Sequence, residues 1–173
     1  MFRYCEWQDL LEIAARKKQK PFLLILDNLE DPRNFGAILR TAEAAGVHGV
    51  IIPKRRSVRV NDTVLRTSTG AAELVPVAQT ANINEVIKRL RKAGVWVAGL
   101  EADGDRDYRA ADYTDSLALV TGSEGRGLAR LTRELCDYIV SIPLKGRITS
   151  LNASVAAALL LYEVVRQRDK IQL

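Results

Sequence analysis

The chain has 173 residues, 47% of them hydrophobic and 27% charged, which is the composition of an ordinary folded domain. Its length predicts one domain that buries about 70% of its unfolded surface, so no disulfide or metal is needed to stabilise it. The net charge of +5 favours a polyanionic partner such as nucleic acid.

The sequence shows no sign of export or of membrane insertion. No apolar run approaches the roughly 20 residues that span a bilayer, and the first residues lack the pattern of a signal peptide. The two cysteines, Cys5 and Cys136, have no metal-ligand spacing and are expected to be reduced thiols. We therefore expect a cytoplasmic protein with no membrane partner and no metal.

Residues 1–20 differ in character from the rest of the chain. A short amphipathic helix is followed there by the basic run RKKQK at 16–20. We expect an N-terminal arm or linker remnant over residues 1–20 and one domain over residues 21–173. The chain would then be one portion of a longer protein.

From residue 22 onward, short apolar runs alternate with amphipathic segments. Strands are expected at 22–26, 49–53, 95–101, 117–122 and 138–143. Helices are expected at 31–46, 62–70, 82–93, 128–136 and 153–168. In the first helix, Asp31 is the expected N-cap, Pro32 the first helical residue and Gly46 the stop signal. This alternation predicts an α/β fold with a mostly parallel sheet flanked by helices.

Ligands of such sheets bind beyond the carboxyl ends of the strands, which directs attention to three junctions. The first is NLEDPRNFGAILRTA at 28–42. Gly36 permits close backbone approach there, and Arg40 could hold a phosphate through its planar guanidinium. A capped helix with a solvated arginine explains the same residues, so this junction alone does not decide between the two.

The second and third junctions are also rich in glycine and polar residues. TGSEGRGL at 121–128 has three glycines that could cradle a ligand, although a plain tight turn fits as well. Its spacing matches neither the dinucleotide-binding fingerprint nor the nucleophile elbow of hydrolases. The third junction, IPLKGRITSLN, carries Ser150 and Asn152, either of which alone could cap the following helix. The other would be available to a ligand.

Together the three junctions resemble the three motifs of the SpoU-type ribose 2′-O-methyltransferases of the SPOUT superfamily. The matching segments are DPRNFGAILRTAEAAG, TGSEGRGL and IPLKGRITSLNASVAAALLLYE, which with the strands between them cover 21–168. Within that family the chain is most similar to bacterial enzymes that methylate a guanosine ribose in 23S ribosomal RNA. The resemblance implies a C-terminal deep trefoil knot, a homodimer whose active sites draw on both chains, and S-adenosylmethionine as cofactor.

The resemblance also assigns roles to individual residues. The positions that match cofactor-binding residues are Gly122, Ile142 and Leu151, with Leu100, Leu144 and Asn152 as neighbours. The positions that match residues of catalysis and substrate positioning are Asn34, Arg40, Glu124, Ser150 and Asn152. Proposals for the family make the arginine at position 40 the base, but a guanidinium stays protonated. We expect Arg40 to anchor a phosphate while Ser150, Glu124 or a water takes the proton.

Basic residues outside the motifs are expected to contact RNA phosphates. They are Lys54, Arg55, Arg56, Arg59 and Arg66, together with the basic run at 16–20. The single histidine, His48, lies between a helix and a strand and is expected to be structural. The chain departs from the family in having Leu144 where a methionine is frequent, and in lacking the small RNA-binding domain that usually precedes the catalytic one.

Three other functions compete with this interpretation. The chain could be a catalytically inactive RNA-binding homologue, although the five motif residues are intact. It could be a nucleotide-binding enzyme of the Rossmann type, which the glycine spacing disfavours. It could also be a tRNA 2′-O-methyltransferase of the same superfamily, which only overall likeness distinguishes from an enzyme of ribosomal RNA.

Overall fold

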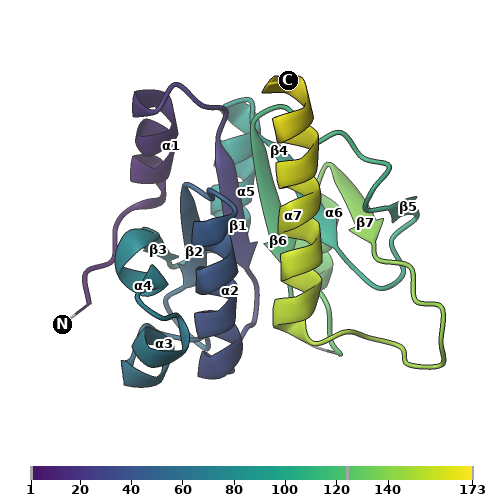
Figure 1. Ribbon diagram of the computed structural model, residues 1–173, viewed down its shortest axis with the longest axis horizontal. Coiled ribbons are helices and arrows are strands. Elements are labelled where there is room, and N and C mark those ends of the chain that lie inside the picture. Colours follow the sequence, from purple (N-terminus) through teal and green to yellow (C-terminus); the bar gives the residue numbers. More distant parts are fainter. Residues whose placement is uncertain (1, 124, 173) are drawn as a thin grey trace.

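The structure is a computed structural model that describes residues 2–123 and 125–172, with side chains up to residue 170. Seven parallel strands form one sheet in the order β3-β2-β1-β6-β4-β7-β5 (Figure 1). The strands are β1 (Phe22–Leu26), β2 (Gly49–Pro53), β3 (Val77–Thr80), β4 (Trp96–Leu100), β5 (Arg106–Asp107), β6 (Leu117–Thr121) and β7 (Tyr138–Ser141).

Helices cover both faces of this sheet (Figure 1). They are α1 (Trp7–Arg16), α2 (Pro32–Ala44), α3 (Asp62–Thr67), α4 (Ala71–Leu74), α5 (Ile83–Lys92), α6 (Arg130–Leu135) and α7 (Ala153–Gln172). The helices α2, α3, α4 and α7 pack on one face, and α1, α5 and α6 on the other. This arrangement confirms the α/β fold with a parallel sheet.

Alternate side chains of the central strands belong to two separate hydrophobic cores. In β1, Phe22, Leu24 and Leu26 pack toward α2 and α7, whereas Leu23 and Ile25 pack toward α1 and α5. All residues of β1 and β6 are buried, because helices cover both faces of these strands. Continuous apolar runs such as FLLIL are therefore the expected sequence of this sheet's centre.

The strand order brings distant parts of the chain together. Strand β6 lies between β1 and β4, and β7 lies between β4 and β5, although both are formed later in the chain. Because the strands are parallel, the segments that follow Leu26, Leu100, Thr121 and Ser141 all leave the sheet at one edge. This carboxyl edge carries the three junctions.

The N-terminal segment that the sequence sets apart as an arm packs onto the sheet. Leu10 and Ala14 of α1 are fully buried, and Gly49 of β2 lies directly beneath Leu10, where a Cβ atom would collide with it. Upstream of the helix, the hydroxyl of Tyr4 accepts a hydrogen bond from the amide of Val60 at 2.9 Å. These contacts make residues 2–16 part of the packed structure.

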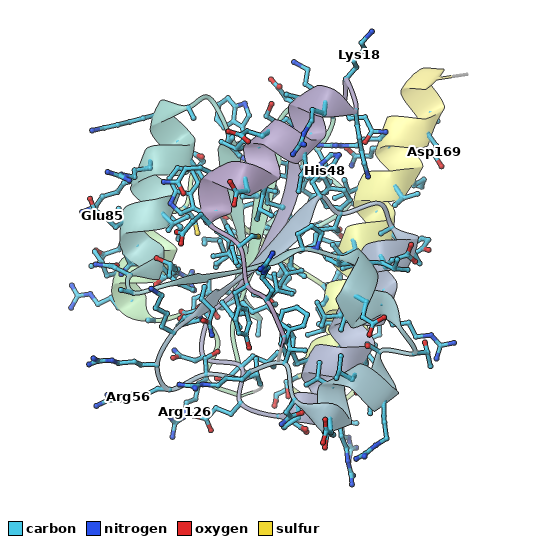
Figure 2. The ribbon with its side chains drawn as sticks, turned by 90° about the vertical axis from the view of Figure 1, so that its left-hand side faces the viewer. Lys18, His48, Arg56, Glu85, Arg126 and Asp169 are labelled. Carbon is cyan, nitrogen blue, oxygen red and sulfur yellow. The ribbon has the colours of Figure 1, made fainter. Side chains whose placement is uncertain are left out.

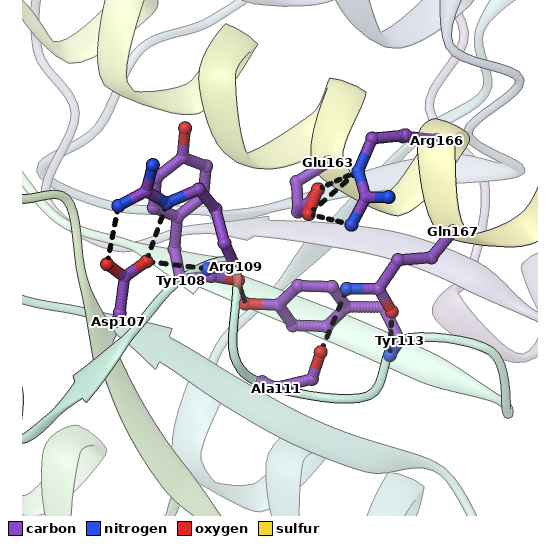
Figure 3. A network of polar contacts seen from close by, with 8 residues as sticks. All are labelled: Asp107, Tyr108, Arg109, Ala111, Tyr113, Glu163, Arg166 and Gln167. Atoms are coloured by element: carbon purple, nitrogen blue, oxygen red, sulfur yellow. Dashed lines mark hydrogen bonds and ion pairs between the residues drawn. The ribbon is translucent and has the colours of Figure 1, made fainter.

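The polar segment between β5 and β6 is held against α7 by side-chain hydrogen bonds (Figure 3). The amide of Gln167 accepts from the backbone N–H of Tyr113 at 2.8 Å and donates to the carbonyl of Ala111 at 2.9 Å. The buried Tyr113 hydroxyl donates to the carbonyl of Tyr108 at 2.6 Å. The Asp-rich excursion is thereby fixed to the C-terminal helix.

Candidate functional site

A cavity of about 640 Å³ opens at the carboxyl edge, where β4, β6 and β7 end. Five of the six residues predicted to bind the cofactor line it: Leu100, Gly122, Ile142, Leu144 and Leu151. Ser150, which was predicted to act in catalysis, lines the cavity with them. The structure thus brings together residues that are up to 51 positions apart in the chain, from Leu100 to Leu151.

The second junction forms a tight loop that doubles back on itself. The backbone N–H of Gly127 donates to the carbonyl of Ser123 at 3.1 Å, and Gly125 and Gly127 have φ angles of 82° and 66°. A Cβ atom on Gly122 would collide with the carbonyl of Gly127, so only glycine fits there. Glu124, predicted to act in catalysis, lies outside the described residues.

The third junction leads directly into α7, and Asn152 is its cap. Its Oδ1 accepts from the backbone N–H of Ser154 at 2.9 Å and from the Ser154 hydroxyl at 2.6 Å. A longer bond of 3.4 Å comes from the N–H of Val155. Asn152 therefore satisfies helix donors; among the described residues it bonds to neither of the other motifs and does not line the cavity, while Ser150 and Leu151 remain available to a ligand.

The first junction has the predicted start of a helix but does not reach the cavity. Asp31 caps α2 by accepting from the N–H of Arg33 at 2.9 Å, and Pro32 is the first helical residue. Gly36 is buried against Thr67 at the end of α3, so its missing side chain serves helix packing instead of ligand approach. Asn34 is half-buried and Arg40 is exposed on α2, and neither lines the cavity.

A second hollow of about 810 Å³ lies between α2, α7 and the segment at Tyr108. On α7, Val155, Leu159 and Tyr162 line this hollow and are each exposed by 39% or more. Their spacing of four and three residues places them on one face of the helix. Arg40 follows Ala37 of the same hollow by one helical turn. We call this surface the α2–α7 face.

The predicted RNA-contacting residues divide between the two edges of the sheet. Lys54, Arg55, Arg56 and Arg59 are exposed in the loop after β2, on the carboxyl edge, and Arg66 is exposed on α3. Figure 2 shows Arg56 and Arg126 at one end of the molecule and Lys18 at the other. The cavity itself adds three cations that sequence reasoning missed: Arg126, Arg130 and Arg133.

Glu101 is a further residue of the cavity that was not predicted. Its Oε1 accepts from the backbone N–H of Leu128 at 2.8 Å, which ties the end of β4 to the glycine-rich loop. Beside it, Arg133 donates to Asp103 at 2.6 Å and holds the pKa of that carboxyl below its usual range. The signal that could have found Glu101 is its position directly after a strand, the same rule that identified the three junctions.

His48 is buried at the opposite edge, as a structural residue. Its Nδ1 accepts from the backbone N–H of Phe22 at 2.9 Å, so Nε2 carries the proton and donates to Oε1 of Gln19 at 2.8 Å. Burial, reinforced by the charges of Lys17 and Arg168, lowers its pKa to about 4. The histidine is therefore neutral at pH 7 and lies at the end of the sheet opposite the cavity.

The described residues contain no group of three or more His, Cys, Asp or Glu side chains placed to hold a metal ion. Burial raises the pKa of the Cys136 thiol to about 12 and also raises that of Cys5, which keeps both thiols protonated and unreactive. Within the part of the chain that the structure describes, no helix is both long enough and apolar enough to span a bilayer.

Sequence comparison places these features in a family. The model of the SpoU rRNA Methylase family matches residues 21–162. The putative TrmH family tRNA/rRNA methyltransferase YacO of Bacillus subtilis is 49% identical over 170 residues, which cover 98% of this chain and 68% of YacO. A Staphylococcus aureus protein of the same description is also 49% identical over 170 residues.

Solved structures agree with this placement. The SpoU methyltransferase AviRb of Streptomyces viridochromogenes, in complex with AdoMet, superposes with a TM-score of 0.81 at 36% identity, over 88% of this chain and 62% of AviRb. An AdoMet-bound rRNA methyltransferase of Sinorhizobium meliloti gives 0.83 at 32% identity, over 95% of this chain and 61% of that one. The chain thus spans less than two thirds of these two structures. It belongs to the SpoU rRNA methylase family of the SPOUT superfamily, a family of S-adenosylmethionine-dependent RNA methyltransferases.

Proposed function

We propose that the chain transfers a methyl group from S-adenosylmethionine to a ribose 2′-hydroxyl in RNA, at a guanosine of 23S ribosomal RNA. The observation that carries this proposal is the cavity at the carboxyl edge. Five predicted cofactor residues and Ser150 converge there from the second and third junctions and from the end of β4. Its volume of about 640 Å³ lies in the range of small-molecule sites, which is roughly 300–1,000 Å³.

The walls of the cavity suit the parts of this cofactor. Leu100, Ile142, Leu144 and Leu151 would hold the adenine between apolar side chains, with backbone groups at its edge. Gly122 keeps the glycine-rich loop compact where a side chain would collide with Gly127. The bound cofactor supplies a methyl group on a positively charged sulfur, and the residues of the chain have to orient the acceptor.

On the acceptor side, Ser150 stands at the cavity wall and Arg40 carries a permanent charge. We assign Arg40 to the phosphate next to the target ribose, where its planar guanidinium fixes the nucleotide. The proton of the 2′-hydroxyl then passes to Ser150, Glu124 or a water. Alignment of this kind can lower a barrier by about 7–11 kcal/mol, so orientation can supply much of the rate.

Because Arg40 and Asn34 lie outside the cavity of their own chain, we propose a homodimer in which they serve the partner's cavity. The α2–α7 face supports this, since Val155, Leu159 and Tyr162 expose apolar surface that a second copy would cover. The insertion of β6 and β7 between earlier strands supports the further proposal that the C-terminal segment threads through a trefoil knot.

The RNA would approach the carboxyl edge, which carries both the exposed cations of residues 54–59 and the cavity arginines. Phosphate contacts of this kind give binding that weakens steeply with salt. A tRNA substrate is the second candidate, because the relatives are named tRNA/rRNA methyltransferases and a TrmH/SpoU tRNA modifying enzyme of A. aeolicus superposes with a TM-score of 0.82. We place the protein in the cytoplasm, where either RNA is found.

Mapping of 2′-O-methylated nucleotides by mass spectrometry, in cells with and without this chain, tests the proposal. We expect one guanosine of 23S ribosomal RNA to lose its methyl group when the chain is absent and to regain it on complementation. A methyl group lost from tRNA instead would establish the second candidate. Unchanged methylation of both RNAs would leave an inactive RNA-binding homologue as the better description.

A further inference from the structure

Two carboxylates that the proposed function does not use line the cavity, and of these Asp103 is paired with Arg133, which leaves Glu101. Glu101 lines the cavity directly after Leu100, and its side chain is 13% exposed. One oxygen, Oε1, accepts from the N–H of Leu128 at 2.8 Å. The other, Oε2, accepts no hydrogen bond from the residues that the structure describes. Since a carboxylate offers about four acceptor positions, most of the acceptor capacity of Glu101 remains unused.

The neighbouring cation does not use this capacity. Arg133 lies 3.9 Å from Oε1 of Glu101 but donates its short hydrogen bond, of 2.6 Å, to Asp103. A carboxylate that is mostly withdrawn from water is costly unless donors surround it. The position of Glu101 is therefore best explained by hydrogen-bond donors that a ligand brings into the cavity.

The glycine-rich loop is shaped to leave room for this carboxylate. Gly127 has a φ of 66°, and a Cβ atom on it would collide with Oε2 of Glu101. Any side chain at position 127 would thus be strained and would displace the carboxylate. Glu101 and the loop form one unit, in which the N–H of Leu128 holds Oε1 and the absence of a side chain at Gly127 leaves room for Oε2.

We propose that Glu101 binds the ribose of the cofactor, accepting hydrogen bonds from the 2′- and 3′-hydroxyls of its adenosine. This inference rests on the proposed binding of S-adenosylmethionine in the cavity. Leu100 would contact the adenine, and Glu101, the next residue, would then face the next group along the ligand. Two neighbouring hydroxyls match the two oxygens of a carboxylate, as they do for the acidic residue that follows a strand in dinucleotide-binding folds.

The test compares wild-type protein and Glu101→Gln by calorimetry, with S-adenosylhomocysteine and its 2′-deoxy and 3′-deoxy analogues. Glutamine keeps an oxygen for the N–H of Leu128 but loses the charge, so we expect about tenfold weaker binding of S-adenosylhomocysteine. Wild-type protein should bind each deoxy analogue more weakly than S-adenosylhomocysteine by a similar factor. The variant should lose little further affinity for the deoxy analogues, because the same interaction is already weakened.

Two controls make the result specific. Glu85→Gln removes a carboxylate that pairs with Lys88 on the exposed surface of α5; neither residue lines the cavity, so all affinities should stay unchanged. 5′-Methylthioadenosine keeps the ribose but lacks the amino-acid group, so Glu101→Gln should weaken its binding by the same factor. Unweakened binding of this nucleoside would mean that Glu101 faces the ammonium group, and the inference would be wrong.

The inference is also wrong if Glu101→Gln weakens the binding of S-adenosylhomocysteine and of both deoxy analogues by the same factor. Glu101 would then act only by holding the loop. If the wild-type protein binds the two deoxy analogues as tightly as S-adenosylhomocysteine, the inference is wrong, but the proposed function still stands. A wild-type protein that binds none of these ligands would refute both. Thermal unfolding of Glu101→Gln, expected to match wild type within a few degrees, confirms that the comparison is between folded proteins.

Discussion

Arg40 is exposed on α2, one helical turn from Ala37 on the α2–α7 face and outside the cavity of its own chain. We expect Arg40→Ala to reduce methyl transfer by at least about 100-fold, because the phosphate next to the acceptor loses its anchor. Binding of S-adenosylhomocysteine should stay within about twofold of wild type, since the cavity is untouched. Calorimetry and transfer of labelled methyl groups measure the two effects.

Arg33→Ala is the matched control for this substitution. Arg33 is also exposed on α2, and its side chain has no proposed role, so both activity and cofactor binding should be retained. Loss of cofactor binding in Arg40→Ala would show that Arg40 belongs to the cofactor site of one chain. Full activity of Arg40→Ala would remove Arg40 from the mechanism.

His48 makes stability depend on pH in a defined window. Its pKa is lowered to about 4 in the folded protein, whereas an unfolded histidine titrates near 6.5. Between these values the unfolded chain binds a proton that the folded chain excludes, so stability is complete above pH 6.5 and falls as the pH drops toward 4. We expect a loss of about 1–2 kcal/mol between pH 7 and pH 5, measured by urea unfolding.

The variant His48→Gln cannot titrate and should show a flatter profile over the same window. Asp107, whose pKa is lowered to about 2 by Arg109, loses its charge only in more acidic solution and does not interfere. Equal slopes for the wild type and the variant would mean that other groups cause the pH dependence. The histidine lies at the far edge of the sheet, so cofactor binding should not follow this profile.

At the scale of whole elements, α7 anchors the polar excursion through Gln167 (Figure 3) and also through Arg168, which donates to the carbonyls of Tyr113 and Asp115. Gln167→Ala removes the partner of two backbone groups, the N–H of Tyr113 and the carbonyl of Ala111. We expect a loss of about 1–3 kcal/mol, because these groups would stay unpaired beside the buried Tyr113. Urea unfolding measures the loss, and hydrogen exchange should accelerate at the amide of Tyr113.

Gln8→Ala, an exposed substitution within α1, provides the reference value and should change stability by less than about 0.5 kcal/mol. If Gln167→Ala behaves like this control, solvent replaces the lost bonds and Gln167 does not fix the excursion to α7.

The elements that the sequence predicts well are those with continuous apolar runs. The strands at 22–26 and 49–53 have the predicted ends, because both faces of these strands are buried. The helix predicted at 62–70 ends at Thr67, since Thr69 and Gly70 have φ angles of 50° and 90°, and a separate short helix follows at 71–74. The sequence does not predict strand β5, because its two residues lie in an Asp-rich segment with no apolar pattern.

The site could be predicted only where it follows a strand end within the same chain. Motif residues after β6 and β7 meet in the cavity as expected, whereas Glu101 was missed because its segment matched no motif. The distance of Arg40 from the cavity could not be foreseen, since hydrophobic periodicity identifies strands but not which strands are neighbours. The position of β6 between β1 and β4 is one of these neighbour relations, which periodicity does not reveal.

At the scale of the whole molecule, the α2–α7 face is the proposed contact between two copies. Leu159→Glu places a charge at its centre and should yield a monomer in analytical ultracentrifugation, with methyl transfer reduced by at least about 100-fold. Binding of S-adenosylhomocysteine should be retained within a few fold, because a single chain lines the cavity.

Leu131→Glu changes a leucine that is more exposed than Leu159, on α6, which packs on the opposite face of the sheet, and should remain dimeric and active. A Leu159→Glu variant that is still a dimer would place the interface elsewhere. A variant that is monomeric but fully active would show that each chain contains a complete site.

The position of β6 has a consequence for biosynthesis. A nascent polypeptide that has left the ribosome up to residue 116 contains β1 and β4, but the strand that separates them is still missing. Until residues 117–121 emerge, β1 keeps an open edge and β4 lacks both of its neighbours, β6 and β7, so these strands can pair with foreign ones. The remaining edge of β4 stays open until β7 follows at residues 138–141, and the methyl-donor crevice takes shape only after that.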